Sequence, residues 1–99
     1  MDLSEVGRAL ASPTRLQILR WLKDPEQHFS SQHDGDMGEA GVCASLIAAK
    51  VGASQPTVSR HLEVLRRAGL LVSERIAGRN FHRRDEDALA EARRLLTEL

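Results

Sequence analysis

The chain has 99 residues, enough for one small domain and too few for two hydrophobic cores of ordinary size. Its hydrophobic share of 41% and charged share of 28% are typical of a folded globular chain and exclude an intrinsically disordered one. Fourteen Lys and Arg residues balance fourteen Asp and Glu residues, and this zero net charge, taken alone, argues against a nucleic-acid partner.

Three helices are predicted in the first half of the chain. Apolar residues at spacings of three and four predict a short helix over about residues 3–10 and a second helix that begins at Pro13. Residues 24–41 show no helical or strand periodicity and are rich in Gly, Ser, Asp and His, so we expect a long polar loop there. Small apolar residues predict a third helix over residues 43–51, and Gly52 is placed to end it in a left-handed conformation.

The second half predicts a helix, a β-hairpin and a final helix. Ser54 is a favourable N-cap for a helix over about residues 54–68, since its hydroxyl can accept a hydrogen bond from a backbone N–H of the first turn. Aliphatic and β-branched residues around a short turn predict a hairpin over about residues 70–84. An acidic start favours a last helix within residues 85–99, because carboxylates stabilise a helix N-terminus. We therefore expect a mainly helical fold with a small β-hairpin, in a single domain over residues 1–99.

The third and fourth helices, joined by a tight turn, have the form of a helix-turn-helix over about residues 43–68. The solvent face of the fourth helix carries short polar residues and Arg at its N-terminal end, where a recognition helix contacts base edges in the major groove. The hairpin would act as a wing, because Arg near its tip can bind flanking phosphates or the minor groove. The predicted contacts with DNA are Ser54, Gln55, Pro56, Thr57, Ser59, Arg60 and His61 in the helix and Arg75 and Arg79 in the wing.

Alternative roles stay open for several of these polar and charged side chains. His61 lies inside the helix, where packing or a structural hydrogen bond competes with a base contact. Four further arginines can bind DNA, stay in solvent, or pair with Glu63 or with the acidic last helix; these are Arg66, Arg67, Arg83 and Arg84.

The zero net charge hides an uneven distribution. Residues 1–53 carry five basic and seven acidic side chains, and residues 85–99 carry two and five. Between them, residues 54–84 carry seven Arg against two acidic side chains, a local net charge of +5. Because a polyanion responds to charge within a Debye length of about 8–10 Å, the local charge favours a nucleic-acid partner despite the neutral total. Arginine also suits bidentate contacts with phosphate and guanine.

The residues of the predicted recognition helix resemble those of a known family. Residues 54–62, SQPTVSRHL, and residues 65–71, LRRAGLL, are similar to the ArsR/SmtB transcriptional regulators. Residues 11–19, ASPTRLQIL, are similar to the family's second-helix signature, so the likeness covers most of residues 4–84. The resemblance implies a homodimeric winged helix-turn-helix repressor that binds double-stranded operator DNA and leaves it on a signal.

A homodimer also suits the composition. Only three aromatic residues are present, and a chain this short has difficulty covering an apolar C-terminal stripe by itself. The resemblance implies dimerisation through the first and last helices, over about residues 3–10 and 85–99. The expected contacts are Leu3, Val6, Leu10, Leu89, Ala92, Leu95, Leu96 and Leu99.

Metal sensing is the feature in which the sequence departs from the family. Many members bind a metal ion through two cysteines one residue apart at the start of the third helix, and here residues 43–45 read Cys-Ala-Ser. Other members use His on the last helix, and residues 85–99 contain none. We therefore expect no metal site, no cofactor and no thiol switch at Cys43, and the effector is unknown. The alternative is a metal- or thiol-responsive regulator with an atypical site, for which the polar loop offers His28, His33, Asp34 and Asp36.

Other classes of function fit the sequence less well. A winged helix used for protein contact would carry apolar residues on the outer face of residues 54–67, where polar ones stand. No spacing sets a nucleophile beside a base, and no Gly-rich phosphate loop follows a strand, so we expect no enzyme. A single cysteine, the lack of an apolar run of about 18 residues and the lack of a secretion signal predict a cytoplasmic protein without a membrane partner.

Overall fold

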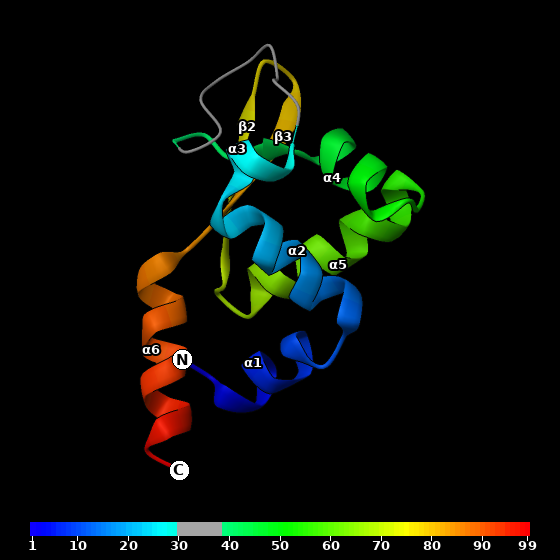
Figure 1. Cartoon of the computed structure of the whole chain (residues 1–99). Helices are drawn as coiled ribbons and strands as arrows, with labels where there is room; N and C mark the ends of the chain where they lie inside the picture. Colours follow the sequence, from blue (N-terminus) through cyan, green and yellow to red (C-terminus); the bar gives the residue numbers. More distant parts are fainter. Residues whose placement is uncertain (30–38) are drawn as a thin grey trace.

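The computed structural model describes residues 1–29 and 39–99. Its elements in chain order are α1 (Leu3–Leu10), α2 (Pro13–Lys23), α3 (Pro25–His28), β1 (Val42–Cys43), α4 (Ala44–Val51), α5 (Gln55–Arg67), β2 (Leu71–Ile76), β3 (Arg79–Arg84) and α6 (Glu86–Thr97). Helices α2, α4 and α5 pack together, and the hairpin of β2 and β3 extends away from α6 (Figure 1). The expected fold class, mainly helical with a small β-hairpin, is confirmed.

The helix ends follow from local sequence. The Ser54 hydroxyl accepts a hydrogen bond from the Thr57 backbone N–H at 3.3 Å, which confirms the predicted N-cap of α5. Ser12 and Asp85 cap α2 and α6 in the same way. Gly52 ends α4 in the left-handed conformation, with φ +81°, as predicted. These caps satisfy backbone groups that a helix end leaves without partners.

The expectation of a polar loop over the whole of residues 24–41 is wrong at its start. Pro25 opens the short helix α3, and Phe29 after it is buried. The Phe29 ring meets the Trp21 ring edge to face, with the ring centroids 6.4 Å apart. One turn of helix is too short to show a periodicity, so an aromatic anchor outside the pattern holds it in place. Residues 30–38 of the expected loop lie outside the described residues.

The expected helix start at Cys43 is wrong by one residue, because Val42 and Cys43 form strand β1. They pair antiparallel with β3, Val42 opposite His82 and Cys43 opposite Phe81, and give the sheet the order β1-β3-β2. Gly41 before them has φ +97°, and a Cβ there would lie 2.3 Å from the His82 backbone oxygen. The hairpin is therefore part of a three-stranded sheet. Strand β1 can approach β3 this closely because residue 41 before it is a glycine.

The core lies between the helices and the sheet. Val58, Leu62 and Leu65 of α5 are buried, as their spacing predicts. The largest fully buried side chains are Phe81, Ile18, Ile47, Leu62, Leu65, Leu70, Val6, Val42 and Val58. This burial fixes which face of α5 points outward. The helices are also short, and none within residues 1–29 and 39–99 is long and apolar enough to cross a membrane.

Candidate nucleic-acid interface

Helix α5 presents a polar surface at its N-terminal end. Of the seven residues of this helix start that were predicted to contact DNA, six are exposed: Ser54, Gln55, Pro56, Thr57, Ser59 and Arg60. The Ser54 hydroxyl also donates to the Thr57 hydroxyl oxygen at 2.9 Å, which orders both side chains at the start of the helix. Because the apolar face of α5 is buried in the core, these groups can only point outward.

The seventh residue, His61, lies on the side of α5 that faces α1 and α2. Its ring is half-buried, and Nδ1 lies 3.1 Å from a guanidinium nitrogen of Arg15. Arginine has no acceptor, so Nδ1 must accept this hydrogen bond and the imidazole is neutral with its proton on Nε2. Burial, and then the charge of Arg15, lower the pKa of His61. The structural hydrogen bond that the sequence left open is thus present, and a DNA contact of His61 stays a prediction.

The β2 and β3 hairpin has a two-residue turn that exposes its arginines. Ala77 and Gly78 connect the paired residues Ile76 and Arg79, and both have positive φ, +51° and +77°. Two-residue turns with positive φ at both central positions match the right-handed twist of the two strands that they connect. Arg75 and Arg79 are exposed beside this turn.

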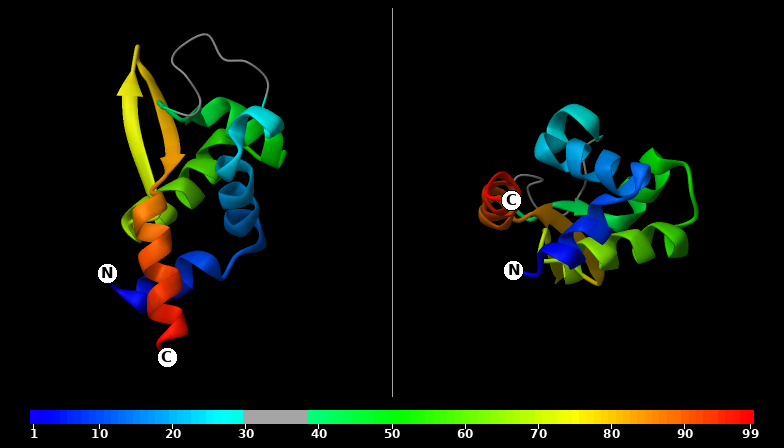
Figure 2. Two further views of the ribbon diagram at one scale, coloured as in Figure 1. Left: turned by 60° about the vertical axis from the view of Figure 1, so that its left-hand side comes forward. Right: turned by 90° about the horizontal axis from the view of Figure 1, so that it is seen from below.

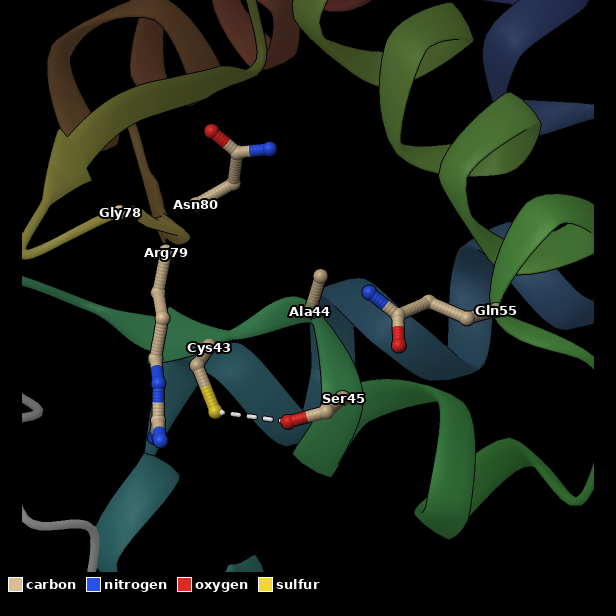
Figure 3. Close-up of a pocket in the computed structure, with 7 residues that line it drawn as sticks. All are labelled: Cys43, Ala44, Ser45, Gln55, Gly78, Arg79 and Asn80. Carbon is tan, nitrogen blue, oxygen red and sulfur yellow. Dashed lines mark hydrogen bonds between the residues drawn. The ribbon is translucent and has the colours of Figure 1, made fainter.

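A groove separates the hairpin from the helix-turn-helix. One part of it, about 330 Å³, is lined by Cys43, Ala44, Ser45, Gln55, Gly78, Arg79 and Asn80 (Figure 3). A second part, about 290 Å³, shares Ala44, Gln55 and Asn80 with the first and continues along α5 to Glu63 and Arg66. In Figure 3 the amides of Gln55 and Asn80 both point into the space between α5 and the hairpin. The sequence reasoning missed Asn80, although its position directly after the basic turn is a usable signal.

Ion pairs separate the arginines of residues 54–84 into two groups. Glu63 binds Arg66 at 2.6 Å and Arg67 at 3.1 Å. The hydrogen bond from Arg66 is the largest cause that lowers the pKa of Glu63, to about 2. The remaining pairs are Arg83 with Glu74 at 2.6 Å, and Arg84 with Glu86 at 2.8 Å; Arg84 also donates to the Leu19 backbone oxygen.

The other three arginines of this segment are Arg60, Arg75 and Arg79. Within the described residues they form no ion pair. All three are exposed, and they are the arginines that the sequence assigned to DNA. Within residues 54–84, the arginines without an ion pair in the described part of the chain therefore lie on α5 and in the wing.

Helices α1 and α6 lie beside each other at the end of the molecule away from the wing (Figure 2). Val6, Leu89 and Ala92, expected in a dimer contact, are buried within the chain itself. Leu3, Leu10 and Leu95 are half-buried, and Leu96 and Leu99 are 47% and 91% exposed. The part of the predicted dimer surface that is available to a partner is thus centred on the C-terminal half of α6.

Of the cysteine and histidine candidates, the structure describes Cys43 and His28. Cys43 is buried at 4% exposure, and its sulfur lies 3.2 Å from the Ser45 hydroxyl oxygen. Within residues 1–29 and 39–99, no group of three or more His, Cys, Asp or Glu side chains could hold a metal ion. His28 ends α3, and the remaining candidates of the polar loop, His33, Asp34 and Asp36, lie outside the described residues.

A helix-turn-helix followed by a β-hairpin wing defines the winged helix-turn-helix class of DNA-binding proteins. A family model of helix-turn-helix domains matches residues 10–74. The chain is 44% identical over 91 residues to the uncharacterized HTH-type transcriptional regulator YbzH of Bacillus subtilis, covering 92% of this chain and 91% of that protein. It is 30% identical over 96 residues to the uncharacterized HTH-type transcriptional regulator MJ1325 of Methanocaldococcus jannaschii, covering 97% and 92%.

A solved structure gives the same result. The homodimeric winged helix-turn-helix DNA-binding domain of Mb0332 from Mycobacterium bovis, a possible ArsR-family transcriptional regulator, matches with a TM-score of 0.68. It is 27% identical, over 96% of this chain and 75% of that one. The chain belongs to the helix-turn-helix transcriptional regulators of the ArsR family. The family and the class of function expected from the sequence are confirmed.

Proposed function

We propose that this chain is a repressor that binds a specific double-stranded operator as a homodimer and leaves it on a signal of unknown chemistry. The exposed polar start of α5, beside arginines without an ion pair in the described part of the chain, supports this most. The contacts we propose are those of the sequence analysis: Gln55, Thr57, Ser59 and Arg60 at the bases, Ser54, Pro56 and His61 beside them, and Arg75 and Arg79 at the backbone.

The chemistry of these side chains fits base reading. Arg60 can bind guanine O6 and N7 with two hydrogen bonds, and Gln55 can do the same with adenine N6 and N7. Thr57 accepts a hydrogen bond from Ser54, so its own hydroxyl proton stays available for a base or a phosphate. Arg79 at the wing tip can bind phosphate or the minor groove, which anchors the protein without selecting a sequence.

The test starts with a preferred duplex, which the parent protein selects from random DNA. Changing Gln55→Ala and Arg60→Ala together should weaken binding to that duplex, at a cost of about 1–3 kcal/mol for each base contact. The preference for the selected bases should relax as well. Fluorescence anisotropy with the selected duplex and with random DNA measures both effects.

A matched control removes an exposed arginine that is not among the proposed contacts. Arg20→Ala in α2 lowers the net charge by one, as Arg60→Ala does, and should leave the preference unchanged. The assignment of the reading face is wrong if the Gln55 and Arg60 double variant keeps the parent affinity and selectivity.

Further parts of the proposal concern the whole chain. We take residues 1–99 as one domain, with the helix-turn-helix, the wing and two dimerisation helices, and without enzymatic activity of its own. The polar outer face of α5 does not favour protein contact as the main role. Operator binding places the protein where the chromosome is, which is the cytoplasm in bacteria and archaea.

A further inference from the structure

Arg15 of α2 connects the first helix to the reading helix. Its Nε donates to the Ala9 backbone oxygen at 2.7 Å, and one terminal nitrogen donates to the Arg8 backbone oxygen at 2.9 Å. The other terminal nitrogen donates to Nδ1 of His61 in α5 at 3.1 Å. The guanidinium of Arg15 in α2 therefore contacts both α1 and α5, which lie before and after α2 in the chain.

The planar geometry of the guanidinium fixes the direction of each of these hydrogen bonds. Arg8 and Ala9 belong to the last turn of α1, where backbone oxygens lack the usual partner four residues on; the Arg8 oxygen also accepts from the Ala11 backbone N–H at 3.2 Å. Arginine can satisfy two such oxygens and a third acceptor at once, because its donors diverge from a planar fork. Lysine keeps the charge but presents it as a single ammonium, which cannot reproduce this planar fork.

We propose that Arg15 is a positioning residue for DNA recognition, which holds α5 in register with α1 through His61. This inference rests on the proposed function, since it assigns operator reading to α5 and dimerisation to α1. Arg15 is half-buried and its three guanidinium nitrogens are occupied within the protein, so it acts through His61 and not on DNA. Dimerisation and operator binding are then coupled through one side chain, and coupling of this kind is reciprocal.

The main test variant is Arg15→Lys, which keeps the net charge. Its affinity for the selected duplex should fall about tenfold, a typical size for coupling between sites. Its affinity for random duplex DNA, and the slope of log affinity against log salt, should stay at the parent values, because no phosphate contact is lost. General destabilisation of the protein would weaken binding to both duplexes. A lower affinity for the selected duplex with an unchanged affinity for random DNA therefore indicates a positioning role.

His61 variants break the same link while leaving the bonds to α1 in place. Because His61 is itself a proposed DNA contact, the comparison of the double variant with the single variants, and not the loss in a His61 variant by itself, tests the role of Arg15. His61→Leu removes the acceptor, and His61→Asn offers an amide oxygen near the position of Nδ1. We expect His61→Asn to bind the selected duplex more tightly than His61→Leu. In Arg15→Lys with His61→Leu, the loss should not exceed that of the larger single variant, since both changes break one contact. Thermal unfolding checks that each variant is folded.

The results separate this inference from the proposed function. If the parent selects no preferred duplex, the proposed function fails first. If it does, and Arg15→Lys binds like the parent, or loses selected and random DNA equally, or adds its loss fully to that of His61→Leu, the positioning role of Arg15 is overturned.

Discussion

Pairing between single residues decides which arginines are free to meet DNA. Arg66 and Arg67 lie three and four positions after Glu63 on the same helix, the spacing at which side chains on a helix surface meet. With its pKa lowered to about 2, Glu63 keeps its charge under ordinary conditions. These pairs are exposed and worth little stability, but they reduce the positive charge along the C-terminal half of α5. This distribution of charge supports the proposal that specific reading belongs to the start of the helix.

Two histidines make the stability depend on pH. Burial lowers the pKa of His82, which is 9% exposed and lies 2.8 Å from the Ser73 hydroxyl through Nδ1, while the charge of Glu63 raises it in part. The pKa of His61 is lowered as well, by burial and by Arg15. Both fall below the ordinary value of 6.5, so the unfolded chain binds more protons near and below that pH.

The expected result is a loss of stability on mild acidification. The contribution of the two neutral imidazoles is fully present above about pH 6.5 and is lost as the pH falls towards their lowered pKa values. Urea unfolding from about pH 7.5 to about pH 5.5 should therefore give a decreasing free energy of unfolding. His61→Asn, with one titrating group fewer, should show a smaller decrease. A free energy that rises over this range contradicts the argument.

Sequence patterns predict a helix or strand well where residues within or next to that element stabilise it. Ser54, Gly52 and the spacing of Val58 and Leu62 mark the ends and the buried face of α4 and α5, and the structure agrees. Strand β1 depends instead on pairing with β3, and nothing within Val42–Cys43 encodes that partner. The same holds for α3, which is stabilised by an aromatic contact outside its single turn.

The wing is the element whose role can be tested separately. Arg79→Ala removes an exposed charge from the hairpin tip and leaves α5 intact. It should weaken all duplexes by similar factors and flatten the slope of log affinity against log salt by about one unit for each bound wing. Titrations at several salt concentrations measure the slope, with Arg20→Ala as the control of equal charge. An unchanged slope shows that the hairpin tip stays off the backbone.

At the scale of the whole molecule, the sequence predicts which residues belong to the candidate interface, but not how these residues are arranged in space. The sequence named the exposed residues of α5 and the wing arginines, since periodicity tells exposed positions from buried ones. It did not show the contact of Arg15 with His61, 46 positions apart, or Asn80 facing Gln55 across the groove. Such pairs depend on how α2, α5 and the sheet pack, which single-sequence patterns do not contain.

In the proposed function, operator reading depends on dimerisation, which is a property of the whole molecule. A two-fold dimer places two copies of α5 against half-sites about one helical turn, 34–36 Å, apart. The available apolar surface is small and centred on α6, where Leu96 and Leu99 are exposed and Leu95 is half-buried. A charge placed there should oppose association, because it must lose water when a partner covers it.

Leu96→Glu should therefore shift the protein towards monomer, and should weaken binding to a duplex with two inverted half-sites far more than binding to a single half-site. Ala90→Glu is the matched control, because it adds the same charge to an exposed position on another face of α6. Since Leu96 is 47% exposed, the change should have little effect on folding of the protomer. Light scattering measures the oligomeric state, and anisotropy with the two duplexes measures binding. A parent protein that is a stable monomer at micromolar concentration, yet binds the inverted repeat tightly, contradicts dimeric reading altogether.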